Sequence, residues 1–130
     1  MIKWFEKHNK LSWLVTIFGA LMIFYLSSIS YFPTVIGKGG VNFLSIIYHI
    51  SAFFCLAFFL FVSVRRTNYI FILAIFISMF YGILDEVHQL FVTGRFCSFF
   101  DFLLDITGIL FAFMIYFISI KYRQIKIQKL

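Results

Sequence analysis

The sequence is a series of long apolar runs separated by short polar connections. Four of these runs are about 22 to 24 residues long, which is enough for a helix to cross a hydrocarbon core of about 30 Å. The connections contain Pro, Gly or paired Arg residues, which are typical of turns. Because the runs are long and the connections short, the pattern predicts helices and excludes a β-barrel. The expected spans cover residues 11–32, 43–64, 69–92 and 99–120.

Composition places the chain in the same class. Of its 130 residues, 63% are hydrophobic and 12% are charged, whereas a soluble domain carries about a quarter charged residues. No stretch is left over for a separate soluble domain. We therefore expect residues 1–130 to form a single membrane domain, with a short polar and basic head before the first span.

The basic residues predict the orientation in the membrane. Nine of the eleven Lys and Arg residues lie in the head, in the 65–68 turn or in the tail after residue 120, and the other two are Lys38 and Arg95. An excess of basic residues marks the cytoplasmic side. The prediction is an all-α integral membrane protein, a compact bundle of four transmembrane helices with both termini in the cytoplasm. Because the net charge of +6 comes from the ends of the spans, no nucleic-acid partner is expected.

One polar stretch interrupts the apolar pattern at residues 82–105, which read GILDEVHQLFVTGRFCSFFDFLLD. It holds four of the chain's five acidic residues. At about 100° per residue, the polar side chains between residues 85 and 89 share one side of a helix, and Asp101 and Asp105 share a face of the next. A charge at the centre of a bilayer costs about 2.5–3.5 kcal/mol. Several charges in one short stretch therefore predict a cluster whose members pair with one another or serve a function.

The expected topology brings more polar residues to the same depth. The first and third spans end at the outer side, and the second and fourth begin there. His49 would lie about six residues, roughly 9 Å, below the outer surface. The residues expected to converge in this layer are Ser27, Ser28, His49, Asp85, Glu86, His88, Gln89, Arg95, Asp101 and Asp105.

Four kinds of chemistry fit a histidine among carboxylates. The group could bind a divalent metal, because Asp85 and His88 have the i, i+3 spacing of joint ligands. It could act in acid–base catalysis or relay protons. It could also only hold helices together. No HExxH, GxSxG, P-loop or CxxC motif is present, so metal and cofactor stay unknown. The catalytic candidates are His49, Asp85 and Glu86, and the binding candidates are Ser27, Ser28, His88, Gln89, Arg95, Asp101 and Asp105.

Small residues and cysteines add two expectations. Gly108 and Ala112 continue the Asp101–Asp105 face as a small-xxx-small arrangement, which lets another helix approach closely. Cys55 lies midway along a span and Cys97 in a connection, so we expect no disulfide between them.

Three blocks of the sequence resemble the VanZ-like family of small bacterial membrane proteins. They are FYLSSIS at 24–30, YHISAFFCLAF at 48–58, and residues 82–108. The chain departs from the pattern at Ser45, Ile46 and Thr93, and many relatives have Asn in place of Asp105. The family's motif residues correspond here to Ser27, Ser28, His49, Gly82, Glu86, Gln89, Gly94, Arg95 and Asp101.

The resemblance implies a multi-pass protein of the bacterial plasma membrane, associated with low-level resistance to the glycopeptide teicoplanin. The leading hypothesis is binding of, or action on, a cell-envelope molecule at the outer face. The implied partners are membrane lipid and a lipid-linked cell-wall precursor or the glycopeptide, and a homo-oligomer is left open. The alternatives are a membrane-embedded hydrolase or transferase, with or without a metal, a proton-coupled transporter, and a structural or accessory protein.

Overall fold

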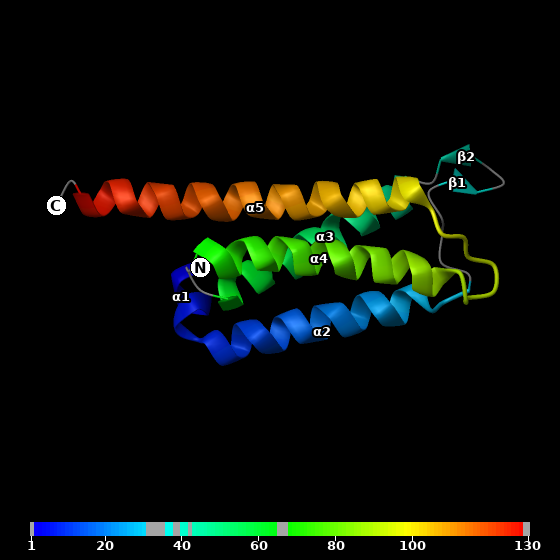
Figure 1. Cartoon of the computed structure of the whole chain (residues 1–130), viewed down its shortest axis with the longest axis horizontal. Coiled ribbons are helices and arrows are strands. Elements are labelled where there is room, and N and C mark those ends of the chain that lie inside the picture. Colours follow the sequence, from blue (N-terminus) through cyan, green and yellow to red (C-terminus); the bar gives the residue numbers. More distant parts are fainter. Residues whose placement is uncertain (1, 31–35, 38–39, 42, 65–67, 129–130) are drawn as a thin grey trace.

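A computed structural model of the chain describes residues 2–30, 36–37, 40–41, 43–64 and 68–128. Four helices, α2 to α5, are long and apolar enough to cross a membrane. The prediction of an all-α protein is therefore confirmed in the described part of the chain, apart from one hairpin of two-residue antiparallel strands, and these four helices have the length and composition that the predicted spans require. The elements are α1 (Ile2–Lys7), α2 (Asn9–Ser27), β1 (Ile36–Gly37), β2 (Gly40–Val41), α3 (Phe43–Val64), α4 (Asn68–Gln89) and α5 (Phe99–Gln128) (Figure 1).

Three helix ends differ from the expected span limits. α2 ends at Ser27 and α4 at Gln89, whereas the apolar runs continue to residues 32 and 92. At the end of α2, the N–H and the hydroxyl of Ser28 both donate to the carbonyl of Phe24, and the N–H of Ile29 donates to the carbonyl three residues earlier. After α4, the N–H groups of residues 90–92 donate hydrogen bonds to the carbonyls three residues earlier, so the chain continues as turns and not as α-helix.

The third difference is at α5, which continues to Gln128, well beyond the expected end at residue 120. At 1.5 Å per residue, its 30 residues measure about 45 Å. Figure 1 shows its C-terminal part projecting past the other helices. The basic tail is therefore helical as far as Gln128, and not only a charged anchor after the span.

The helix α1 was not expected, because residues 1–10 read as a solvated head. It folds back on the bundle, and the ring of Phe5 packs edge-on against that of Phe59 at 5.2 Å. Glu6 accepts two hydrogen bonds from the guanidinium of Arg123, at 2.6 and 2.9 Å, and a third from the hydroxyl of Tyr116 at 3.3 Å. This ion pair joins the first and last helices of the chain.

The helix α3 lies at the centre of the bundle and packs against α2, α4 and α5. Its buried side chains, among them Phe53, Ala57 and Phe61, form the core with residues of α5 such as Ile109 and Tyr116. The other three long helices expose large apolar side chains on their outer faces. In a membrane these faces contact lipid, which is as apolar as they are.

A close helix contact lies at Gly108, where α5 packs against α3. A Cβ atom added there would lie 2.4 Å from the carbonyl oxygen of Ile50 and 2.9 Å from the amide nitrogen of Phe54. Ala112, one turn further, is fully buried. The expected small-residue contact is confirmed, since only glycine fits at this backbone-to-backbone approach.

The two ends of the chain lie at the same end of the bundle (Figure 1). The β1–β2 hairpin and the connection between α4 and α5 lie at the opposite end. Lys38, Arg65, Arg66 and Lys129, which contributed to the orientation argument, are outside the described residues. Cys55 and Cys97 are both free thiols, as expected.

Candidate functional site

Polar side chains gather inside the bundle at the end that carries the hairpin. They come from the end of α2, the start of α3, the end of α4, the start of α5 and the connection before α5. Each is 5% exposed or less, which confirms that they face inward. We call this group the polar cluster; its members are Ser27, His49, Asp85, Glu86, Gln89, Arg95, Asp101 and Asp105.

His49 of α3 is held between two carboxylates of α5. Its Nδ1 atom lies 2.8 Å from Oδ1 of Asp105, and its Nε2 atom lies 3.8 Å from Oδ2 of Asp101. The two aspartates are one helical turn apart, so both can flank one imidazole ring. A carboxylate on one ring nitrogen fixes the tautomer and leaves the other nitrogen for a ligand or a proton.

Ser98 positions two of the carboxylates. Its hydroxyl accepts a hydrogen bond from the N–H of Asp101 at 3.2 Å, so it caps the N-terminus of α5. Its own N–H donates to Oε2 of Glu86 at 2.7 Å. The start of α5 therefore brings Asp101 and Glu86 to the same place, although they lie on different helices.

Gln89 links the carboxylates of α4 to Arg95. Its amide nitrogen donates to Oδ2 of Asp85 at 3.0 Å and to Oε1 of Glu86 at 3.4 Å. Its amide oxygen accepts a hydrogen bond from Nε of Arg95 at 3.2 Å. The chain can deliver Arg95 to this position because Gly94 has a φ of +82°, which an L side chain rarely adopts.

Ser28 and His88 lie at the edge of the cluster and contact each other. The hydroxyl of Ser28 is 2.9 Å from Nε2 of His88, and the imidazole also packs on the ring of Phe24 at 4.3 Å. Asp85 instead bonds with Gln89 and lies beside Ser27. The predicted joint ligation by Asp85 and His88 is therefore not supported, because the two side chains turn to different neighbours.

A different set of residues lies close enough together to be considered as metal ligands. His49, Glu86 and Asp105 each offer one ligand atom, and these atoms all lie within 4.8 Å of one another. They come from three helices, so no spacing motif in the sequence could have identified them. Two contributors to the site were also not predicted. They are the N–H of Ser98 and the ring of Tyr48, which packs edge-on against the imidazole of His49 at 5.3 Å.

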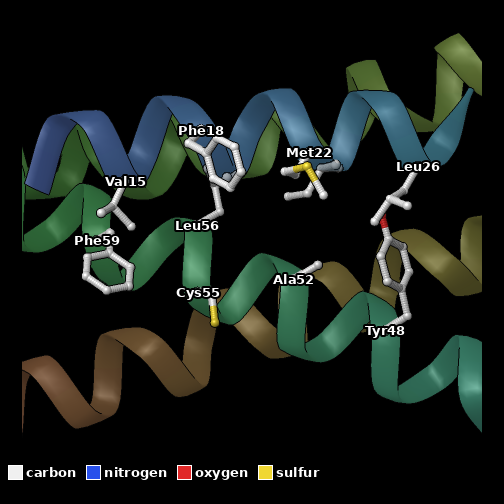
Figure 2. Close-up of a pocket in the computed structure, with 11 residues that line it drawn as sticks. Val15, Phe18, Met22, Leu26, Tyr48, Ala52, Cys55, Leu56 and Phe59 are labelled. Carbon is white, nitrogen blue, oxygen red and sulfur yellow. The ribbon is translucent and has the colours of Figure 1, made fainter.

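An apolar groove of about 210 Å³ lies between α2 and α3 (Figure 2). Phe18, Met22 and Cys55 on its walls are exposed, so the groove opens toward the lipid. Leu26 and Tyr48 lie at one end (Figure 2). Since the next residues along the chain are Ser27 and His49, this end of the groove adjoins the polar cluster.

Comparison with known proteins adds one finding. No curated protein and no solved structure matches the chain. A sequence model described as VanZ/LLP1 matches residues 3–120, a range that includes all four long helices up to the basic tail and every member of the polar cluster. The family is therefore shown by nearly the whole chain: this multi-pass membrane protein belongs to the VanZ/LLP1 family.

Proposed function

We propose that this protein binds an amphiphilic cell-envelope molecule from the outer leaflet of a bacterial plasma membrane, and that it thereby changes susceptibility to teicoplanin. Family membership links the chain to glycopeptide resistance in general terms. The observation that carries the finer proposal is the polar cluster, with four carboxylates, His49 and Arg95 buried at one end of a membrane bundle. Ionisable residues within membrane spans are costly, and they mark ligand or ion sites by default.

The groove between α2 and α3 supports an amphiphilic ligand. An apolar chain in the groove would end beside Leu26 and Tyr48, one residue away from Ser27 and His49 of the cluster. The polar part of the same molecule would then reach the cluster, where the guanidinium of Arg95 suits a phosphate or carboxylate. A lipid-linked cell-wall precursor has both parts.

A second candidate function is catalysis by a membrane-embedded hydrolase or transferase. It is favoured by the 2.8 Å contact between His49 and Asp105, because a histidine oriented by a carboxylate is a common general base. Glu86 and Asp85 would then assist as further proton donors or acceptors. A structural role, in which the cluster only assembles helices, is the outcome to be excluded.

The proposed orientation predicts a labelling pattern. Both termini should be cytoplasmic, so a membrane-impermeant maleimide should label native Cys97 and a Lys38→Cys variant in intact cells. A Lys126→Cys variant in a Cys97→Ser background should react only after permeabilisation. Partial burial of the sulfur, followed by the charges of Glu86 and Asp101, raises the pKa of the Cys97 thiol. Labelling should therefore be run at about pH 8.5, because the thiolate is the reactive form. The reverse pattern would refute the outward-facing site.

The function is tested with isosteric changes at the cluster. Glu86→Gln and His49→Gln keep size and hydrogen-bonding capacity but remove the ionisable group. We expect both variants to accumulate in the membrane like the parent and to return teicoplanin susceptibility to the level of the empty vector. A Glu6→Gln variant, at the other end of the bundle, is the matched control and should keep the parent's effect.

Three results would count against the proposal. Full activity in both cluster variants would assign the cluster a packing role. Loss of activity only in proportion to membrane abundance would do the same. A parent that leaves susceptibility unchanged would refute the link to teicoplanin for this chain.

A further inference from the structure

We infer that His49, Glu86 and Asp105 bind one divalent cation, Mn²⁺ or Zn²⁺, inside the polar cluster. This inference deepens the proposed function and rests on it for its purpose, because the cation would hold the anionic part of the envelope molecule. The binding site itself depends only on these side chains and is tested separately below.

The ligand atoms have nearly the required spacing. They lie within 4.8 Å of one another, and three ligands at about 2.0–2.2 Å from one ion lie about 3.3–3.8 Å apart. Rotations that move each atom by less than about 1 Å would close the set. All three residues are at most 3% exposed, so each is already held by its surroundings.

Buried oxygens without partners are the second, independent observation. Within the described part of the chain, Oδ2 of Asp105, Oδ1 of Asp101 and Oδ1 of Asp85 are buried and accept no hydrogen bond. A buried polar atom left unsatisfied costs about 1–3 kcal/mol, and more when it is charged. Three such atoms in one cluster indicate a missing positive partner, and the Asp105 oxygen belongs to the proposed ligand set.

The charge balance of the polar cluster also favours a bound cation. The cluster contains four carboxylates, one guanidinium and one imidazole. Even with a protonated imidazole, two negative charges would remain in a region of low dielectric constant. A divalent cation compensates this excess without requiring protons on the carboxylates.

The surrounding hydrogen bonds resemble the outer shell of a metal site. The N–H of Ser98 donates to Oε2 of Glu86, which orients that carboxylate. Asp101 lies 3.8 Å from Nε2 of His49 and can orient the imidazole, which leaves Nδ1, beside Asp105, for the cation. Such outer partners fix first-shell ligands in known metal proteins. One nitrogen and several carboxylate oxygens favour Mn²⁺ or Zn²⁺ over Ca²⁺ or Mg²⁺, which take all-oxygen sets.

Metal content after controlled loading tests the site. The protein, purified in detergent through a tag without histidine, is stripped with EDTA, dialysed against MnCl₂ or ZnCl₂, and analysed by mass spectrometry for bound metal. We expect about one ion per parent chain, and an affinity loss of about 10- to 100-fold or more in Glu86→Gln and Asp105→Asn. Glu6→Gln, which removes a carboxylate remote from the site, should bind like the parent.

Spectroscopy keeps the test decisive if the cluster variants fail to fold. Electron spin echo modulation of Mn²⁺ in the parent should show one imidazole nitrogen, and the signal should persist in His8→Gln. If the parent shows no imidazole signal or retains no ion, the metal site is refuted.

Two further outcomes separate the metal site from the proposed function. If the parent binds no metal but Glu86→Gln still abolishes the drug phenotype, the proposed function survives without the cation. If the parent binds metal but confers no phenotype, the metal site survives and the proposed function is refuted.

Discussion

A Gly108→Ala variant is expected to lose most of its folded protein, although the change adds a single methyl group. The new Cβ would lie 2.4 Å from the carbonyl oxygen of Ile50 and 2.9 Å from the amide nitrogen of Phe54. Both are backbone atoms, so no side-chain rotation relieves the clash and α3 and α5 must move apart. Overpacking of this kind costs about 1–3 kcal/mol or more, and here it acts on the contact between the central helix and the longest helix.

Gly19→Ala is the matched control for this prediction. A Cβ at Gly19 would meet nothing closer than the Cδ1 atom of Leu56 at 4.0 Å. Since alanine favours a helix over glycine by about 1 kcal/mol, this variant should be as stable as the parent or slightly more stable. The measurements are membrane abundance and the thermal unfolding midpoint in detergent. Equal stability of the two variants would contradict the close approach of α3 and α5.

The membrane helices could be predicted because hydrophobic length is recorded in the sequence. Phe43–Val64 coincides with the second expected span. The ends were less accurate, because hydropathy does not show where a helix stops within an apolar run: α2 ends at Ser27, although the run continues to residue 32. The helical tail could not be predicted from hydropathy, because the alternation of Lys and Ile after residue 120 does not show where the apolar core ends.

The membership of the polar cluster could largely be predicted, because the order of the spans fixes which ends meet. His49, Glu86, Asp101 and Asp105 all lie at the same end of the bundle, and all are buried. Their individual partners could not be predicted, since these depend on the rotation of each helix about its axis. His88 illustrates the limit: it shares a helix side with Asp85 in the sequence pattern but turns to Ser28 of α2.

Contacts between remote parts of the chain could not be predicted from the order of the spans. Glu6 and Arg123 are 117 residues apart and meet only because α1 folds back on the bundle. The head has low hydrophobicity, and nothing in its spacing indicates that its one acidic residue pairs with a basic residue of the tail. The three proposed metal ligands come from three helices and were likewise visible only in three dimensions.

The two ends of the bundle should respond differently to the loss of an arginine, because Arg95 is buried and Arg123 is partly exposed. Arg95 is 5% exposed, donates to Gln89, and lies close enough to attract the carboxylates of Asp85 and Asp101. An Arg95→Met variant keeps the length of the side chain but leaves those carboxylates without the guanidinium. Removing one partner of a buried ionic group costs about 3–5 kcal/mol, so the thermal midpoint in detergent should fall sharply.

Arg123→Met is the matched change at the opposite end. Its ion pair with Glu6 is 24% exposed on both sides, and exposed pairs contribute about 1 kcal/mol or less. This variant should therefore unfold close to the parent.

A second change separates charge from packing at Arg95. If Arg95→Met fails because negative charge is left uncompensated, the double variant Arg95→Met/Asp85→Asn should recover much of the lost stability, because it removes one charge of the excess. If the guanidinium acts mainly by filling space, Asp85→Asn should bring no recovery. An Arg95→Met midpoint equal to that of Arg123→Met would mean that protons or a bound cation already neutralise the carboxylates. Repeating the melt with EDTA and with Mn²⁺ distinguishes these two cases, since only a bound cation makes the stability of Arg95→Met depend on the metal.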